Sequence, residues 1–190
     1  MPAADAPLPR FRFEPTNTPV EANERAARLV DPGFGRVFTD HMATIRYSQD
    51  KGWHDAEIGA RKSLTIDPST AVLHYAQEIF EGLKAYRLAD GSVSLFRAGD
   101  NARRFQNSAR RMAMAELPAE LFLESIRQLV KAEADWIPDG PDGALYLRPF
   151  MIASEAFLGV KPSAEYLYMV IASSVGAYWK GGARPVSIWV

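Results

Sequence analysis

The strongest hydrophobic pattern lies in the last third of the chain and predicts two β-strands. Residues 166–173 (YLYMVIAS) are apolar on both faces, which is typical of a central, buried strand. Residues 144–152 (ALYLRPFMI) alternate instead, and strand side chains point to opposite faces in turn. Tyr146, Arg148 and Phe150 should therefore share one side of that strand.

Shorter patterns predict further strands earlier in the chain. Residues 41–47 (HMATIRY) alternate well enough for a strand, which a turn over residues 49–52 would end. Residues 78–97 are expected to form a hairpin, because Asp90-Gly91 separates two β-rich runs. Residues 67–69 (DPS) indicate a loop or the start of a helix.

Two amphipathic helices are expected between these strands. The first is capped by Asp100, and its apolar positions recur at helical spacing. The second runs from about Pro118 to Asp135, and a break rich in proline and glycine follows at residues 138–143. The residues expected to face the core are Ala102, Phe105, Ala109 and Met112 in the first helix, and Phe122, Ile126, Leu129 and Val130 in the second.

These elements divide the chain into three parts. Residues 1–32 are rich in proline, alanine and charge, and they predict a loosely held N-terminal arm. Residues 33–175 predict one α/β domain. Residues 176–190 first have the composition of a linker and then begin another strand, VSIWV. We therefore expect this last segment to lead into a second, C-terminal domain.

Composition and charge narrow the possible functions. The 190 residues are 47% hydrophobic and 24% charged, as in a soluble globular protein. The formal net charge of -1 does not favour a nucleic acid or an anionic membrane as partner. Without cysteine, and with three scattered histidines, the chain has no pattern for a metal site or a thiolate nucleophile. Neither a signal peptide nor a membrane-spanning run is evident, so a cytoplasmic protein is expected.

Two arginine positions are the main candidates for ligand binding. Arg148, between two aromatic residues, suits a pocket for a ligand that is part apolar and part anionic. The same pattern also fits a solvent-facing arginine on an edge strand. Arg103 and Arg104, early in the first helix, could bind a phosphate group, or they could belong to a solvated basic face.

Residues 73–82 (LHYAQEIFEG) hold further polar candidates. His74 could pair with Glu78 or Glu81 for acid–base chemistry, but such a pair is more often a structural hydrogen bond. Lys84 could be taken for a Schiff-base lysine, although its place in the expected hairpin argues against that role.

Four segments together resemble the branched-chain amino acid aminotransferases, a family of fold-type-IV pyridoxal-phosphate enzymes. They are FGRVFTDHM (34–42), LHYAQEIFEGLKAY (73–86), ALYLRPF (144–150) and the region 158–178 with LGVKPS, EYLYMV and GAY. The resemblance implies the small N-terminal α/β (α+β) domain of that fold, with a mostly antiparallel sheet and two helices on one face. It also implies a homodimer that transfers the amino group of leucine, isoleucine or valine to 2-oxoglutarate through pyridoxal 5'-phosphate.

The resemblance also assigns roles to single residues. Arg104 matches the arginine that binds the cofactor phosphate, and Tyr75 is placed beside the cofactor. Arg148 matches the arginine that meets the distal carboxylate of glutamate, and Lys84 matches a lysine that is not the Schiff base. The aromatic walls of the substrate pocket are expected from Phe34, Tyr75, Phe80, Tyr146 and Tyr178, and a loop with Leu158 and Val160 is expected to close the neighbouring subunit's pocket.

The resemblance implies that the chemistry needs residues outside this chain. In the family, the Schiff-base lysine and the groups that bind the pyridine nitrogen and the α-carboxylate lie beyond Val190. We therefore expect no catalytic residue here and no activity of the chain alone. Departures from the family pattern at Ala98, Ala115 and residues 58–61 touch no assigned role. Two alternatives stay open: another fold-type-IV enzyme, such as a D-amino acid aminotransferase or aminodeoxychorismate lyase, or a half-protein that acts as a binding or assembly module.

Overall fold

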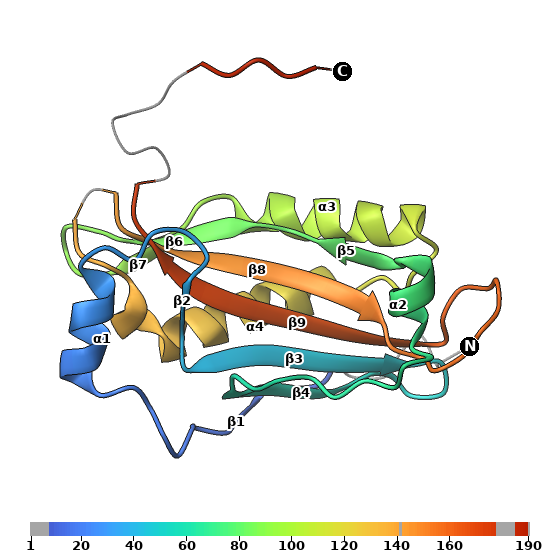
Figure 1. Ribbon diagram of the computed structural model, residues 1–190. Helices are drawn as coiled ribbons and strands as arrows, with labels where there is room; N and C mark the ends of the chain where they lie inside the picture. Colours follow the sequence, from blue (N-terminus) through green and yellow to red (C-terminus); the bar gives the residue numbers. More distant parts are fainter. Residues whose placement is uncertain (1–7, 141, 178–184, 190) are drawn as a thin grey trace.

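The computed structural model describes residues 8–140, 142–177 and 185–189, and its strands form one sheet (Figure 1). The strand order is β1-β4-β3-β9-β8-β6-β7, with β2 also paired to β9 and β5 to β8. All pairings are antiparallel except that of β1 with β4. The strands are β1 (Arg12–Phe13), β2 (Val37–Phe38), β3 (His41–Ser48), β4 (Gly52–Ala60), β5 (Glu78–Phe80), β6 (Leu83–Arg87), β7 (Val93–Leu95), β8 (Ala144–Ala153) and β9 (Glu165–Val175).

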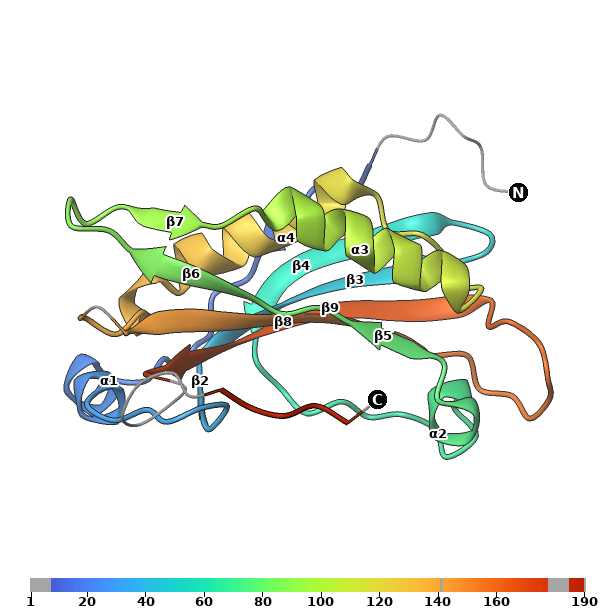
Figure 2. The ribbon, with the colours of Figure 1, turned by 90° about the horizontal axis from the view of Figure 1, so that it is seen from above.

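Two long helices, α3 (Ala98–Arg111) and α4 (Ala119–Ala132), cover the same face of the sheet (Figure 2). The short helices α1 (Ala22–Leu29) and α2 (Ala71–Tyr75) lie on the other side, near the two ends of the sheet. A 3-10 helix, η1 (Ala134–Trp136), follows α4. The expected α/β (α+β) fold, with a mostly antiparallel sheet and two helices on one face, is confirmed. No helix in the described ranges has both the length and the apolar character needed to cross a membrane.

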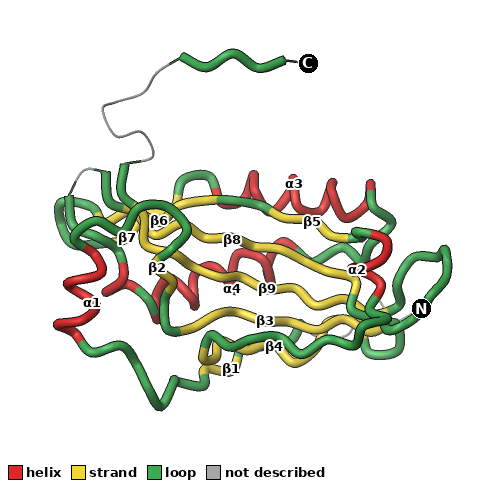
Figure 3. Tube along the Cα trace, in the orientation of Figure 1, coloured by secondary structure: helices red, strands yellow, loops and turns green. Residues whose placement is uncertain are grey.

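The core lies between the two long helices and the central strands. As predicted, β9 is central: it lies between β8 and β3 and is buried over most of its length (Figure 3). The ring of Phe105 in α3 lies 5.5 Å from Phe122 in α4 and 5.5 Å from Tyr168 in β9. The predicted core residues of both helices are buried, except Met112, which is 38% exposed beyond the end of α3.

The N-terminal segment, predicted to be a loosely held arm, makes several specific contacts with the sheet. β1 pairs with β4, and the backbone N–H of Thr16 donates to Nε2 of His41 at 3.0 Å. The N–H of Val20 donates to Oδ1 of Asp40 at 3.1 Å. Backbone donors in residues 8–32 therefore bond to side-chain acceptors next to the start of β3, and the N-terminal arm stays a prediction. A domain division at residue 32 stays a prediction.

Two expectations about helix and strand boundaries are also wrong. Asp100 does not cap α3, which begins at Ala98; it lies inside the first turn and pairs with Arg97 and Arg103. A carboxylate there still stabilises the helix, because the N-terminal end of a helix carries partial positive charge. Residues 186–189, expected to begin a strand, are exposed and form no strand in the described part of the chain.

The expected hairpin over residues 78–97 is only partly correct. β6 and β7 do form a hairpin, with Ala85 opposite Leu95. β5, however, is a separate strand that pairs with β8, and Glu81 and Gly82 separate it from β6. The N–H of Glu81 donates to the carbonyl of Pro149 in β8 at 2.8 Å, which holds this break against the sheet.

We expect the folded state to lose stability at alkaline pH, because burial in the central strand β9 opposes the ionisation of two tyrosines. Burial raises the pKa of Tyr166 to about 12 and also raises that of Tyr168. A tyrosine whose pKa is higher in the folded state contributes stability below its ordinary pKa of about 10, and this is lost as pH rises through the folded value. Thermal melting between pH 8 and 12 should therefore show a steep fall above pH 10. The Tyr168→Phe variant should fall less, and an unchanged profile would contradict the assignment.

Candidate active site

The alternation of β8 divides its side chains between the core and a cavity. Leu145, Leu147 and Met151 are fully buried against the helix layer. Tyr146 and Arg148 point to the other face and are partly exposed, as predicted. Because β8 lies between β9 and β6, the alternative of an arginine on an edge strand is wrong.

Tyr146 and Phe80 hold the Arg148 guanidinium in place. Its Nε and Nη2 both donate to the hydroxyl oxygen of Tyr146, at 3.2 and 2.6 Å. Its Cζ lies 4.4 Å from the centre of the Phe80 ring, a cation–π contact. Among the described residues, no carboxylate forms an ion pair with Arg148. Its positive charge is therefore oriented but not neutralised.

A cavity of about 180 Å³ lies beside this arginine. The rings of Phe34 and Tyr146 are 5.1 Å apart and form part of its wall. The loop that carries Phe34 is joined to the end of β9, because the N–H of Gly176 donates to the carbonyl of Gly33 at 3.2 Å. The lining residues are Phe34, Gly35, Phe38, Tyr146, Arg148, Ile171, Ala172 and Ser173.

Gly82 leaves room for the hydroxyl of Tyr146. A Cβ atom on Gly82 would lie 2.5 Å from that oxygen and 3.2 Å from the ring carbon that carries it. A larger residue at this position would displace the group that holds Arg148. The hydrophobic pattern of the sequence does not predict that position 82 must be a glycine.

The other predicted pocket residues lie elsewhere or outside the described chain. The hydroxyl of Tyr75 accepts a hydrogen bond from the N–H of Gly159 at 2.6 Å, and its ring stacks on Phe157. Tyr75 thus contacts the loop between β8 and β9 and is not among the residues that line the cavity. Leu158 and Val160 on this loop are 71% and 99% exposed. Tyr178 lies outside the described residues.

Arg104 lies on α3 in a second site, where it is paired with Glu81. Its Nε and Nη2 donate to the two carboxylate oxygens of Glu81 at 2.9 and 2.7 Å. This pairing raises the pKa of Arg104, so the guanidinium stays positively charged. The Arg104 side chain is 60% exposed, whereas that of Glu81 is 10% exposed. The sequence pattern suggests Glu81 only as a partner of His74, which instead bonds to the carbonyl of Pro68.

The hollow around Arg104 is rich in donors that suit an anion. Its volume is about 570 Å³, and three arginines reach it together with two side-chain amides. Asp100 is the acidic residue in its lining. The lining residues are Phe96, Arg97, Asp100, Asn101, Arg103, Arg104 and Asn107.

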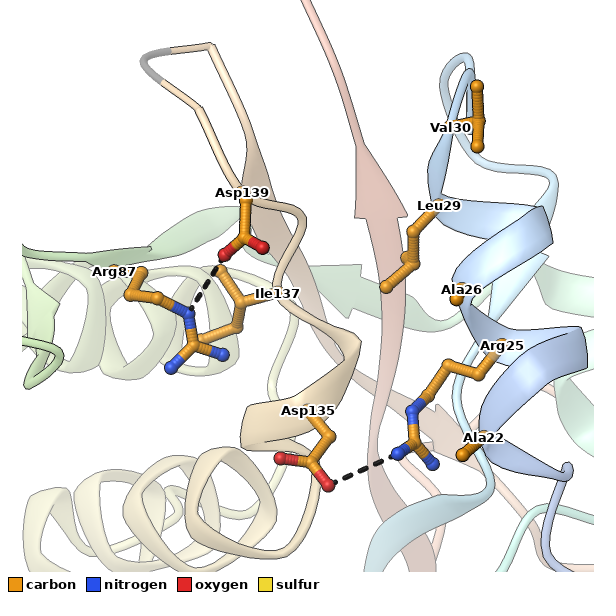
Figure 4. Close-up of a pocket in the computed structure, with 9 residues that line it drawn as sticks. All are labelled: Ala22, Arg25, Ala26, Leu29, Val30, Arg87, Asp135, Ile137 and Asp139. Atoms are coloured by element: carbon orange, nitrogen blue, oxygen red, sulfur yellow. Dashed lines mark hydrogen bonds and ion pairs between the residues drawn. The ribbon is translucent and has the colours of Figure 1, made fainter.

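A larger hollow of about 600 Å³ between α1 and the region after α4 contains none of the predicted site residues (Figure 4). Its two arginines are already engaged: Arg25 pairs with Asp135 at 3.2 Å, and Arg87 lies 3.7 Å from Asp139. Nη2 of Arg87 also donates to the carbonyl of Ala134 at 2.7 Å. These contacts join α1, β6 and η1, so the hollow is explained by packing between elements.

Sequence comparison finds relatives among the branched-chain-amino-acid aminotransferases. The chain is 55% identical over 183 residues to the probable branched-chain-amino-acid aminotransferase of Streptomyces coelicolor, covering 96% of this chain and 51% of the relative. It is 52% identical over 181 residues to the branched-chain-amino-acid aminotransferase of Mycolicibacterium smegmatis, covering 95% and 49%. The chain therefore spans about half the length of the curated relatives that it matches. No family model matches the chain.

Structural comparison agrees with the sequence relatives. A branched-chain amino acid aminotransferase from T.th., solved as a complex with N-(5'-phosphopyridoxyl)-L-glutamate, matches with a TM-score of 0.53 at 26% identity, covering 72% of this chain and 42% of that chain. The Escherichia coli enzyme matches with a TM-score of 0.50 at 18% identity, covering 70% and 40%, and it supports the fold alone.

Proposed function

Since the chain belongs to the branched-chain amino acid aminotransferase family and spans about half the length of its relatives, we propose that it is the N-terminal half of such an enzyme. The complete protein would transfer the amino group of leucine, isoleucine or valine to 2-oxoglutarate. In this proposal the present chain supplies a side-chain pocket and a phosphate site. The lysine that holds the cofactor would come from the part outside this chain, so the chain alone would be inactive.

The observation that carries this function is an arginine on an aromatic wall that has no carboxylate partner among the described residues. Leucine and glutamate must use one site in turn, and they differ only at the side-chain end. Phe34 and Tyr146 provide apolar surface for the first substrate. Arg148 provides the cation that a second carboxylate needs, because an unpaired charge is costly to remove from water. The cavity of about 180 Å³ would hold a side chain, whereas the pocket for a whole ligand usually measures about 300 Å³ or more.

The second site fits the phosphate of pyridoxal 5'-phosphate. Arginine side chains and amides line it, and three arginines outnumber its acids, Asp100 and the adjoining Glu81. Arg104 would bind the phosphate with Nη1, the nitrogen atom that Glu81 leaves free. When bound, the cofactor supplies the electron sink for amino-group transfer, and the protein supplies position and charge. The T.th. structure, named as a phosphopyridoxyl-glutamate complex, supports a pyridoxal-phosphate cofactor for the family.

We assign the loop between β8 and β9 to contact with a second subunit. Leu158 and Val160 are large apolar residues with little cover of their own. Tyr75 holds the loop at its base through the N–H of Gly159. A homodimer in which this loop completes the neighbouring pocket would cover them. We also propose that the complete protein acts in the cytoplasm.

Substrate assays separate this proposal from its rivals. The complete protein should transfer the amino group of leucine to 2-oxoglutarate much faster than that of D-alanine. A preference for D-alanine would favour a D-amino acid aminotransferase, and turnover of aminodeoxychorismate would favour the lyase. Absence of all three reactions would favour a binding or assembly role. The amino-acid assays should include the cofactor in excess.

In the complete protein, Arg104→Ala should weaken binding of pyridoxal 5'-phosphate about tenfold or more. An arginine–phosphate contact contributes roughly 1.5–3 kcal/mol, which corresponds to that factor. Titration of the apo-protein, followed by cofactor absorbance, measures the change. Arg103→Ala is the matched control, because Arg103 pairs with Asp100 and not with Glu81. If the control loses as much affinity, the assignment to Arg104 is incorrect.

A further inference from the structure

Glu81 is a fixed carboxylate beneath a long, exposed arginine side chain. Its own side chain is nearly buried and accepts a hydrogen bond from Nδ2 of Asn101 at 2.8 Å. Its backbone N–H is bonded to the carbonyl of Pro149 in β8. Arg104 is the opposite case, because its side chain is mostly exposed. A free arginine side chain loses rotamer entropy when it is held in one position.

The geometry of the pair determines what Arg104 can still bind. Glu81 occupies the edge of the guanidinium formed by Nε and Nη2. A guanidinium has five N–H donors in a planar fork, so the Nη1 edge remains available. Glu81 also neutralises charge, which alone would weaken an anion site. Positioning and neutralisation therefore predict opposite effects of removing the carboxylate.

We propose that Glu81 is a positioning residue for the cofactor phosphate, acting through Arg104. This rests on the proposed function, in which Arg104 binds that phosphate. Positioning should outweigh neutralisation, because Arg97 and Arg103 share a single carboxylate, Asp100, and keep the hollow positive. Glu81 and Gly82 also link the two sites: Glu81 holds Arg104, and the absence of a side chain on Gly82 leaves room for Tyr146 beside Arg148.

The test is a double-mutant cycle in the complete apo-protein with two probes. Pyridoxal 5'-phosphate and pyridoxal, which lacks the phosphate, are titrated into wild type, Glu81→Gln, Arg104→Ala and the double variant. Glutamine keeps an acceptor for Asn101, and matched melting temperatures would verify folding. Glu81→Gln should weaken pyridoxal 5'-phosphate about fivefold or more, through loss of the bidentate contact, and should change pyridoxal less than about twofold. In the Arg104→Ala background it should change neither probe.

Each outcome separates the positioning role from the alternatives. An equal loss in both backgrounds would make Glu81 a structural residue and overturn the proposal. Tighter binding of pyridoxal 5'-phosphate by Glu81→Gln would make it a competitor of the phosphate. If Arg104→Ala itself spares pyridoxal 5'-phosphate binding, the assignment of Arg104 fails, and the role of Glu81 falls with it. Glu78→Gln, which removes an exposed carboxylate of β5, is the control for a general change in charge and should change neither probe.

Discussion

Replacing Arg148 with methionine in the complete enzyme is expected to impair glutamate and 2-oxoglutarate at least about thirtyfold, while leucine loses less than about tenfold. Methionine keeps an apolar contact with Phe80, but it removes the charge. Because no described carboxylate pairs with Arg148, its charge is available to the distal carboxylate of the substrate. The loss for glutamate should be on the order of 2–5 kcal/mol in transition-state binding. The limit for leucine corresponds to about 1.4 kcal/mol.

The two half-reactions can be measured separately by mixing each cofactor form with one substrate in a stopped-flow instrument. Arg87→Met is a matched control, because Arg87 is also on a strand but contacts Ala134 and Asp139 away from the cavity. It should leave the ratio of the half-reactions unchanged. Equal losses for leucine and glutamate in Arg148→Met would identify Arg148 as a structural residue, and the dual-substrate explanation would fail.

The Phe105→Ala variant should lower the free energy of unfolding by about 3–5 kcal/mol, as large-to-small changes of buried aromatic residues do. Phe105 is 1% exposed and contacts Phe122 and Tyr168, so the cavity left behind has walls in both helices and in β9. Denaturant titration of the chain measures the loss. Phe96→Ala is the control, because Phe96 is 77% exposed and should cost little. A loss below about 1 kcal/mol in Phe105→Ala would show that the surroundings can collapse around the gap.

Strand and helix periodicity predicted the parts of the fold in which one face is buried. Residues 145–151 alternate between buried and partly exposed positions, and the face of Tyr146 and Arg148 followed from that pattern. The buried positions of α3 and α4 also followed from helical spacing. In such segments burial restricts the residue type at each position. The hydrophobic pattern therefore predicts the secondary structure and its buried face.

Where the backbone is irregular, periodicity failed. β4 was not predicted: its register with β3 shifts between Thr44 and Arg46, and Asp55 has a φ of 52°. A bulge of this kind moves side chains to the other face and blurs the alternation. The pairing of Glu81 with Arg104 joins residues 23 positions apart through a break between strands, and no local pattern contains such a contact. The resemblance implied a phosphate site at Arg104, but the carboxylate that holds this arginine could be found only in three dimensions.

The central place of β9 has a consequence for synthesis on the ribosome. β3 and β4 form a hairpin early in translation, but the other edge of β3 must wait for β9, roughly a hundred residues later. At about 5–20 residues per second this delay is roughly 5–25 s. During that time an unpaired strand edge is open to other nascent chains. We expect the yield of folded protein to depend on this interval. Ribosome-associated chaperones should therefore raise the yield, and so should slower initiation on mRNAs that carry many ribosomes.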